Sequence, residues 1–378
     1  MNERLIQAEQ PFGREMIDLF FVLLLTLMIG VGLTTLFSGS LSYGERFFND
    51  PMYFVKKQIV NLLIGIAALS ICSFIRFDFL RSMLPKLVLL TLILTILPFI
   101  PGIGITKNGS SRWIGIGSST FQPSELVKLV LVLFLANLFD KKHEYLDDPT
   151  ISVYPAAIMS GIFISLVYLQ NDFSTSVFLL ITVMVMFYVS GVSISFFIKI
   201  SLVLLPLSAL MILTKEYRVE RVLSFLDPSR DPLGAGYQVN AALTALSEGG
   251  FWGRGLGNGI RKISGIPEVQ NDFIFAVWGE EMGFMGVSAY FILLSAFCVR
   301  GYQISLRSTS RFAFLLGFGS VTLILVQSLM NCGVVVRAFP ATGIPLPFFS
   351  SGGSSLLISL CLSGFIINVS RSKSRGEV

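Results

Sequence analysis

Asp272 is the residue in this sequence best placed to do chemistry. It ends a polar stretch, 214–272, and the apolar run FIFAVWGEEMGFMG begins at the next residue. A carboxylate there can take a proton from a hydroxyl nucleophile as a general base, or it can hold a cation. The structural alternative is a helix cap, because Asp is a common N-cap residue. The polar stretch carries most charges of the middle third of the chain: Arg218, Arg221, Asp227, Arg230, Asp231, Arg254, Arg261, Lys262 and Glu268.

The composition is that of an integral membrane protein. Of 378 residues, 53% are hydrophobic and 13% are charged, whereas soluble domains carry about 25% charged residues. The net charge of +5 is modest and mostly reflects loop Lys and Arg, so we expect no nucleic acid partner. The cysteines Cys72, Cys298, Cys332 and Cys361 lie singly, without metal or redox spacing, and His143 lies in a polar loop without a second histidine.

Apolar runs of the length that crosses a bilayer, about 20 residues, alternate with short polar segments. We therefore expect an all-α polytopic membrane protein, a single domain over 1–378, with about ten transmembrane helices. A large extracytoplasmic loop, about 214–272, separates the seventh helix from the eighth. The N-terminal segment lacks the pattern of a cleavable signal peptide. The predicted spans are 16–37, 55–75, 84–101, 123–139, 153–170, 173–191, 194–213, 273–299, 312–334 and 347–369.

The distribution of Lys and Arg predicts the orientation. With the N-terminus inside, the inner segments hold fourteen Lys and Arg residues and the short outer loops hold six. Such a bias favours the cytoplasm for both termini. The loops 102–122 and 335–346, the turn at 171–172 and the long polar stretch then lie outside, on the side of Asp272.

Two charges, Glu125 and Lys128, lie within the fourth predicted span. Pro123 and Glu125 suit the first turn of a helix, and a spacing of three lets Glu125 pair with Lys128 on one face. A structural ion pair and the polar wall of a groove explain this pattern equally well, since charges within spans are candidates for function. Glu280 and Glu281 pose the same question in the eighth span, where we favour an inward-facing structural role for one of them.

Three outer segments admit both a functional and a structural interpretation. Lys107 and Arg112 beside Trp113 could clamp an anionic substrate, but an interfacial belt is the favoured interpretation of this pattern alone. The glycine run GRGLGNG, 253–259, lacks the βαβ context of a dinucleotide site; its N–H groups could cradle phosphate, or it could be a flexible re-entrant loop. The proline-rich segment 342–347 predicts an irregular re-entrant turn, which membrane proteins tolerate only when it is buried or lines a cavity.

Four motifs together resemble one known family. QPSELVKL, DPLGAGYQV, PEVQNDFIFAVWGEEMGF and ATGIPLPFFSSGGSSL, in this order over ten spans, resemble the SEDS family, the FtsW and RodA peptidoglycan glycosyltransferases. The resemblance extends from about residue 14 to about residue 370 and is specific because all four motifs occur together. The runs FLDPSRDPLGAGYQV and GGFWGRGLGNGIRKI are more similar to FtsW than to RodA.

The resemblance implies roles for individual residues. The family's catalytic Asp, in its PEAHTDF motif, falls on Asp272, and the family's QPSE-x-x-K motif includes Glu125 and Lys128. Its Arg-Trp pair falls on Arg112 and Trp113, and the Asp of its PDxGT turn falls on Asp172. Together with the basic residues of the outer loops, the candidate substrate-binding residues are Lys107, Arg112, Glu125, Lys128, Asp172, Arg218, Arg221 and Arg261.

The implied activity is polymerisation of lipid II into glycan strands at the outer face of the bacterial cytoplasmic membrane, in septal cell-wall synthesis. The implied partners are a class B penicillin-binding transpeptidase and other division proteins. A divalent cation, Mg²⁺ or Mn²⁺, could bridge the pyrophosphate, although the sequence offers no dedicated metal cage. The alternatives are a RodA-like elongation polymerase, a lipid II flippase and a non-catalytic division scaffold.

The sequence departs from the family pattern at several positions. Gln270 and Asn271 stand where the family motif has His and Thr, directly before its catalytic Asp. The His of the motif is therefore absent here and cannot be the base in this protein. Asn171 and Ser174 replace Pro and Gly in the PDxGT turn, and Ser351 replaces the Tyr of SYGGSS. None of these changes removes the candidate carboxylate.

Overall fold

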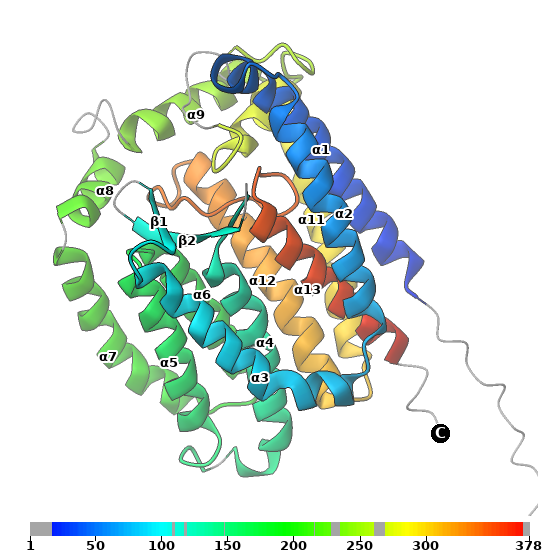
Figure 1. Ribbon diagram of the computed structural model, residues 1–378, viewed down its shortest axis with the longest axis vertical. Helices are drawn as coiled ribbons and strands as arrows, with labels where there is room; N and C mark the ends of the chain where they lie inside the picture. The colour runs from blue at the N-terminus through cyan, green and yellow to red at the C-terminus, as the bar shows by residue number, and fades with distance from the viewer. Residues whose placement is uncertain are drawn as a thin grey trace, which may run out of the picture.

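The structure of the protein is a computed structural model, and it describes residues 17–107, 110–116, 119–146, 148–214, 216–227, 235–260 and 269–372. The described chain is mainly α-helical (Figure 1). Its helices are α1 (Leu19–Phe48), α2 (Tyr53–Phe74), α3 (Phe77–Ile96), α4 (Pro123–Lys141), α5 (Val153–Leu169), α6 (Phe173–Val189), α7 (Ile194–Leu213), α8 (Glu216–Leu226), α9 (Ala235–Gly249), α11 (Ile274–Leu306), α12 (Arg311–Val335) and α13 (Gly353–Ser372).

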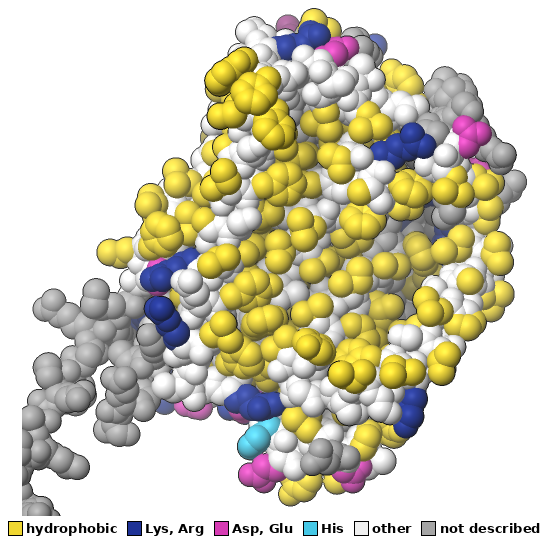
Figure 2. Space-filling model, turned by 180° about the vertical axis from the view of Figure 1, so that it is seen from behind, with side chains coloured by type: hydrophobic (Ala, Val, Ile, Leu, Met, Phe, Trp, Pro, Cys, Tyr) yellow, Lys and Arg dark blue, Asp and Glu magenta, His cyan; other side chains and the backbone are white. Residues whose placement is uncertain are grey.

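Each of the ten predicted spans coincides with a helix, which confirms the expected fold class. Seven of these helices, α1, α2, α3, α7, α11, α12 and α13, are long and apolar enough to cross a membrane. The other three are α4, which carries the two buried charges, and α5 and α6, which have 17 residues each. Hydrophobic side chains form a broad band across the back of the molecule, with Lys, Arg, Asp and Glu mainly towards its ends (Figure 2).

The ends of several spans differ from those predicted. Helix α1 continues to Phe48, past the predicted end at residue 37, and α11 continues to Leu306. The extension of α1 is polar, so hydropathy alone misses it, but its aromatic rings pack on the start of α2: Phe48 stacks on Tyr53 with ring centroids 3.9 Å apart. Helix α13 begins at Gly353 and not at residue 347, because Pro347 lies in a turn before it.

Both long outer loops contain regular structure that the sequence analysis did not predict. The 214–272 loop holds α8 and α9. The 102–122 loop holds an antiparallel sheet of β1 (Gly104–Lys107), β2 (Ser110–Ile116) and β3 (Ser119–Phe121), in which β2 is central. Short strands separated by Gly and Ser turns are a weak signal beside long apolar helices. This sheet carries Arg112 and Trp113 at fixed positions above the helices.

The helices differ greatly in burial. Most residues of α4, α12 and α13 are buried, and these helices form the centre of the bundle. In contrast, no residue of α7 is buried, and α7 lies at the edge of the bundle, at the left of Figure 1. The candidate site described below is built mainly from α4, α6, α12 and the segment before α13.

Helix α11 is broken at Gly283, where φ is 62° and ψ is −163°. A polar loop pairs with the broken backbone: the N–H of Arg254 donates to the carbonyl of Glu280 at 3.1 Å, and the N–H of Gly255 donates to that of Glu281 at 2.9 Å. Beyond the break, the N–H groups of 284 and 285 donate to the carbonyls of 250 and 251. The break thus supplies a strand-like edge inside a helix, and the glycine loop is bonded to it.

This pairing requires close backbone approach at Gly253. Its φ is +78°, and a Cβ atom there would lie 2.2 Å from the carbonyl oxygen of Glu281. Gly257 has a similar φ of +84°, but no heavy atom of the described residues lies within 4 Å of a Cβ there. The two glycines therefore share the left-handed conformation and differ in the space around them.

We predict that Gly253→Ala lowers the unfolding temperature of the purified protein more than Gly257→Ala does. Both substitutions carry the cost of a left-handed alanine, about 1–2 kcal/mol, but only the first adds a clash with backbone that cannot move freely. Thermal unfolding in detergent measures the difference. Equal shifts for the two variants would contradict the close packing of this loop on α11.

Candidate functional site

Asp272 lies at the junction of the outer loop and α11 and is half-buried. The N-cap position of α11 is Phe273, one residue later, and it makes no side-chain capping bond. Its Oδ2 atom lies 3.4 Å from the place where a Cβ on Gly343 would stand. The carboxylate thus faces the proline-rich segment that precedes α13.

That segment, 340–352, has no helix or strand and is largely buried, as the re-entrant prediction required. Its backbone carbonyls accept hydrogen bonds from side-chain amides. Asn331 donates to Ile344 at 2.8 Å, Gln327 donates to Pro345 at 2.8 Å, and Gln58 of α2 donates to the carbonyl of residue 350 at 3.0 Å. Irregular backbone at membrane depth needs such partners, because water cannot satisfy it there.

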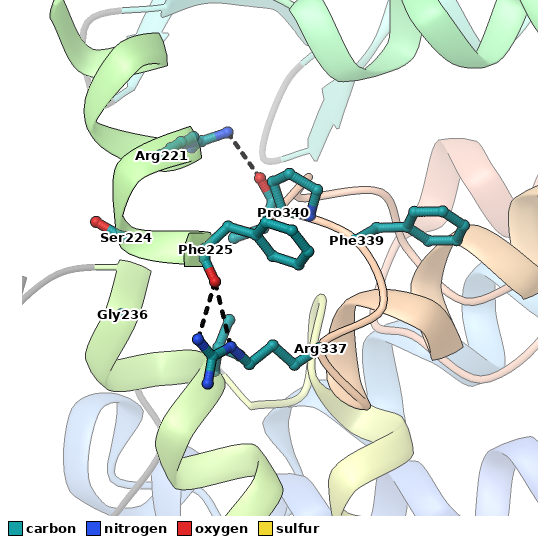
Figure 3. A pocket seen from close by; sticks show the side chains of 9 residues that line it. Arg221, Ser224, Phe225, Gly236, Arg337, Phe339 and Pro340 are labelled. Carbon is teal, nitrogen blue, oxygen red and sulfur yellow. Dashed lines mark hydrogen bonds between the residues drawn. The ribbon is translucent and has the colours of Figure 1, made fainter. Parts of the chain in front are cut away.

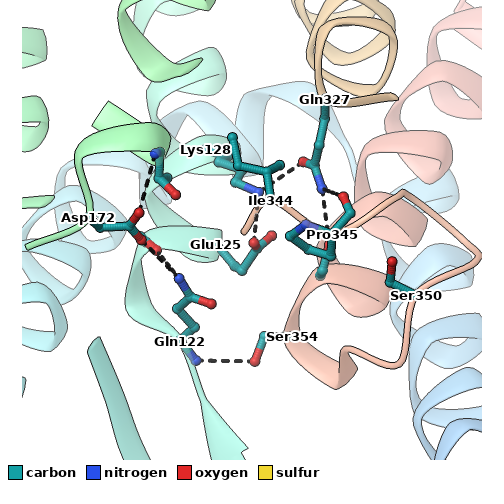
Figure 4. Close-up of polar contacts among 12 residues, drawn as sticks. Gln122, Glu125, Lys128, Asp172, Gln327, Ile344, Pro345, Ser350 and Ser354 are labelled. Atoms are coloured by element: carbon teal, nitrogen blue, oxygen red, sulfur yellow. Dashed lines mark hydrogen bonds and ion pairs between the residues drawn. The ribbon is translucent and has the colours of Figure 1, made fainter. Parts of the chain in front are cut away.

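The predicted pairing of Glu125 with Lys128 is confirmed, with Nζ 2.7 Å from Oε1 and both side chains buried. The ammonium also donates to Oε1 of Gln327 at 2.9 Å. Gln327 in turn holds Pro345 and accordingly links the ion pair to the irregular segment (Figure 4). The ion pair therefore helps to hold the irregular segment in place, and it also forms a polar wall beside that segment, which Asp272 faces.

The amides Gln327 and Asn331 lie four residues apart on α12 and share one helix face. Asn331 donates both to Ile344 and to the backbone carbonyl of Asp272, the latter at 2.7 Å. One face of α12 therefore connects the Lys128 ammonium at one end with Asp272 at the other. A shift of this helix would displace both charged groups together.

A second cluster surrounds Asp172, at the N-terminus of α6. Its Oδ1 atom accepts from the backbone N–H of Thr175 at 3.3 Å and lies 3.4 Å from a guanidinium nitrogen of Arg112. Its Oδ2 atom accepts from Nε2 of Gln122 at 3.2 Å. Arg112 also donates to the carbonyl of Asn171. The structure thus brings together three motifs that are far apart in the sequence, and Asp172 acts as a helix cap within them.

The departure from the family pattern at Asn171 has a conformational basis. Asn171 has a φ of 62°, in the left-handed region that Asn tolerates better than most residues. Proline, which the family motif has at this position, is fixed near −65° and cannot adopt this conformation. The turn that presents Asp172 is therefore built differently here, although Asp172 still pairs with Arg112.

The two arginines of α8 have different surroundings. Arg218 is buried, stacks on the rings of Tyr168 and Phe173 at 4.5 and 5.4 Å, and donates to the carbonyl of Met211 at 2.8 Å. It attaches α8 to the bundle. Arg221 is exposed and donates to the carbonyl of Ala341 at 3.2 Å, at the start of the irregular segment.

Figure 3 shows a small hollow between α8, α9 and the irregular segment. Arg337 closes one side of it, because its guanidinium donates to the carbonyl of Phe225 at 2.9 Å. Arg221 reaches across another side. These contacts position α8 over the segment that faces Asp272, so that Arg221 is a cation at the outer edge of the site.

The remaining predicted residues contribute less to this geometry. Lys107 is the last residue of β1 and pairs with Ser110, but its side chain lies outside the described residues, as does Arg261. Glu280 and Glu281 are both buried: the first accepts from the N–H of Ile260 at 2.7 Å. Both, not one, therefore face inwards. The glycine run packs on these glutamates, and the N–H groups of Arg254, Gly255 and Ile260 donate to them. These N–H groups are therefore not available to cradle a phosphate.

Sequence reasoning missed the amides Gln58, Gln327 and Asn331. A signal for them exists, because each is an amide within a predicted span, where an unsatisfied polar group is costly. Within the described ranges, no group of three or more His, Cys, Asp and Glu side chains is arranged to hold a metal ion.

Comparison with known proteins places this fold and site in one class. The model of the FtsW, RodA and SpoVE family, described as cell cycle protein, matches residues 18–375. A probable peptidoglycan glycosyltransferase FtsW of Geobacter sp. (strain M18) is 35% identical over 95% of this chain and 97% of its own length. Stage V sporulation protein E of Bacillus subtilis (strain 168) is also 35% identical, over 94% of this chain and 97% of its own length.

Solved structures agree with this placement. One chain from a study described as "Structural coordination of polymerization and crosslinking by a peptidoglycan synthase complex" superposes with a TM-score of 0.78 at 28% identity, covering 94% of this chain and 98% of that one. The rod shape determining protein RodA of Thermus thermophilus has the same fold, with a TM-score of 0.68 at 24% identity, over 94% of this chain and 97% of its own. The chain therefore belongs to the FtsW/RodA/SpoVE family, the SEDS family of the sequence analysis.

We predict that Lys128→Met destabilises the protein or impairs its function, because it leaves the buried Glu125 carboxylate without its cation. Breaking a buried ion pair costs about 3–5 kcal/mol. Leu129→Met is the matched control, since it keeps a buried apolar side chain of similar volume on the same helix, at a cost below about 1.5 kcal/mol.

The double variant Glu125→Gln/Lys128→Met tests the pairing itself. Removing both charges should restore part of the unfolding temperature lost in Lys128→Met. Unfolding temperatures in detergent give the comparison. If Lys128→Met and Leu129→Met were tolerated equally, the ion pair would have no structural role.

Proposed function

We propose that this protein is a peptidoglycan glycosyltransferase that polymerises lipid II into glycan strands at the outer face of the cytoplasmic membrane, in septal cell-wall synthesis. Family membership and full-length relatives named as probable glycosyltransferases support the activity. The observation that carries the proposal is Asp272, a half-buried carboxylate at a membrane edge that faces an irregular segment, 340–352, bordered by cations.

The reaction joins two lipid-linked sugars. The 4-hydroxyl of the acceptor attacks C1 of the donor sugar, a new C1–O bond forms, and the bond from C1 to the polyprenyl pyrophosphate breaks. The hydroxyl proton must leave, and Asp272 accepts it as general base. A positioned base contributes about 10²–10⁴ in rate. Gln270 is neutral and not a base, whereas Asp272 is a carboxylate that faces the irregular segment and can accept the proton.

The leaving pyrophosphate needs positive charge, since charge develops on it as the bond breaks. Arg112 and Lys128 lie inside the protein, with side chains 20% and 2% exposed, whereas Arg221 is exposed above the segment, where it donates to the carbonyl of Ala341. Arg221 is therefore the first choice for contacting pyrophosphate, with Lys107 and Arg261 as further candidates. Mg²⁺ usually takes one or two carboxylates and completes its shell with phosphate and water, and Asp272 could supply such a carboxylate.

A flippase and a scaffold are the competing functions. A transport path would place polar groups near the middle of the membrane. Here the described polar clusters gather instead where α4, α6 and α11 begin, beside the outer loops. We propose a class B penicillin-binding transpeptidase as partner, in keeping with the solved structure described as a peptidoglycan synthase complex. Placement of both termini in the cytoplasm, with the protein at the division septum, completes the proposal.

We predict that Asp272→Asn abolishes glycan polymerisation and leaves the unfolding temperature nearly unchanged. The amide is neither basic nor anionic, but it keeps the size of the side chain. The assay is polymerisation of purified lipid II by the purified protein, with glycan products separated by length. Asp227→Asn, at the exposed end of α8, is the matched control and should remain active. A well-folded Asp272→Asn protein with normal activity would refute the mechanism.

We predict that a membrane-impermeant maleimide labels Ser247→Cys but not Thr309→Cys in intact cells. Both residues are exposed, the first on α9 and the second between α11 and α12 at the opposite end of the bundle. The bias in Lys and Arg places α9 outside and the second site in the cytoplasm. Labelling of Thr309→Cys without permeabilisation would reverse the proposed orientation.

A further inference from the structure

A cavity of about 450 Å³ lies at the end of the bundle opposite Asp272. It is formed where α2, α11 and α13 end and where α3 and α12 begin. Asp272 precedes the first residue of α11, whereas the cavity lies after its last residue, so the length of the longest helix separates the two. Its lining residues are Phe74, Ile75, Arg76, Phe77, Asp78, Arg81, Thr309, Ser310, Phe312, Asn368, Arg371 and Ser372.

Three arginines and one aspartate give the cavity a net positive lining. Arg76 is exposed, and its nearest acid, Asp78, is 3.8 Å away and equally exposed, so solvent weakens that pair. Arg371 donates to the carbonyl of Ser73 at 2.8 Å and stacks on Phe74 at 4.3 Å. These contacts fix the Arg371 guanidinium at the wall. Arg81, the third arginine, is paired with Asp140 and contributes less charge to a ligand.

Helix ends of both signs lie at the cavity, because α3 and α12 begin there and α2, α11 and α13 end there. Helices α3 and α12 both begin at its wall, and a helix N-terminus favours an anion. The C-terminal carbonyls of α2 would oppose this, but they accept hydrogen bonds from side chains: Asn368 donates to Cys72 and Ile75 at 2.8 and 2.7 Å, and Arg371 donates to Ser73. The negative end of α2 is thus compensated within the protein.

Aromatic side chains form the rest of the wall. Phe77 and Phe312 pack edge to face, with ring centroids 5.5 Å apart. Phe74, the last residue of α2, lines the cavity and is 60% exposed, and Phe79, in the first turn of α3, is 53% exposed. An apolar surface therefore continues from the cavity onto the outside of the bundle. A ligand with an anionic head and an apolar body matches both parts.

We propose that this cavity binds the phosphate headgroup of an anionic phospholipid, with its acyl chains lying along the exposed aromatic surface of α2 and α3. Basic pockets between helices on the cytoplasmic side of membrane proteins bind such headgroups. Free inorganic phosphate would meet the same arginines, but it would gain nothing from Phe74 and Phe79. The orientation proposed above places this cavity in the cytoplasmic leaflet, where it is separate from the reaction at Asp272.

Native mass spectrometry of the full chain in neutral detergent tests the site. We expect a discrete bound dioleoyl phosphatidylglycerol that dioleoyl phosphatidylcholine does not replace. The variant Arg76→Gln removes one lining charge without removing a helix-capping bond, since the Arg76 side chain makes none. It should weaken phosphatidylglycerol binding about five-fold, and Arg76→Glu should weaken it further, as expected for about one unit of charge near anionic lipid.

Arg307→Gln is the matched control, because Arg307 is exposed at the same end of the bundle and does not line the cavity. It should leave phosphatidylglycerol binding unchanged. Equal retention of the two lipids, or equal losses in Arg76→Gln and Arg307→Gln, would overturn the proposal. Complete displacement of the lipid by inorganic phosphate would assign the cavity to free phosphate instead. These readouts need no lipid II, so they stand apart from the test of the glycosyltransferase activity.

Discussion

The site depends on one constraint: the irregular segment 340–352 runs through the protein at membrane depth, and its carbonyls need hydrogen-bond donors. Leaving one buried carbonyl unsatisfied costs about 1–3 kcal/mol. Gln58, Gln327 and Asn331 supply these donors. Two of them also hold charged groups, since Gln327 accepts from Lys128 and Asn331 donates to the backbone of Asp272. The amides that satisfy the segment therefore also fix the distance between the buried ion pair and the backbone of Asp272.

The ten helices could be predicted because burial in lipid imposes length and hydropathy directly on the sequence. The position of Asp272 just before α11 could be predicted because the hydropathy pattern changes there. The helices and strands of the loops could not be predicted in this way. Helices α8 and α9 are amphipathic or short, and the strands of the sheet 104–121 are too short to show an alternation of apolar and polar residues. The amides were missed because a lone Gln in an apolar run does not reveal its partner, which for Gln58 is the carbonyl of residue 350.

The sequence also does not reveal the partners of the candidate cations. Sequence identifies Arg112, Lys128, Arg218 and Arg221 as outer or intramembrane charges, but the partner of each depends on segments far away in the chain. Arg112 meets Asp172, Lys128 meets Glu125 and Gln327, and Arg218 meets two aromatic rings. Three of the four thus serve first to join elements of the fold. Arg221 is exposed on α8 and bonds to the carbonyl of Ala341, at the start of the irregular segment.

The break of α11 at Gly283 has a consequence for biosynthesis. The glycine loop 250–255 emerges from the ribosome before the carbonyls of Glu280 and Glu281 to which it bonds. In the orientation proposed above, it crosses the membrane without these partners and waits until α11 has been inserted. Domains generally fold in the order of their synthesis, yet this loop is completed by a later helix. Assembly of the outer face is accordingly a late event, set by the insertion of α11 and not by the translocation of the loop.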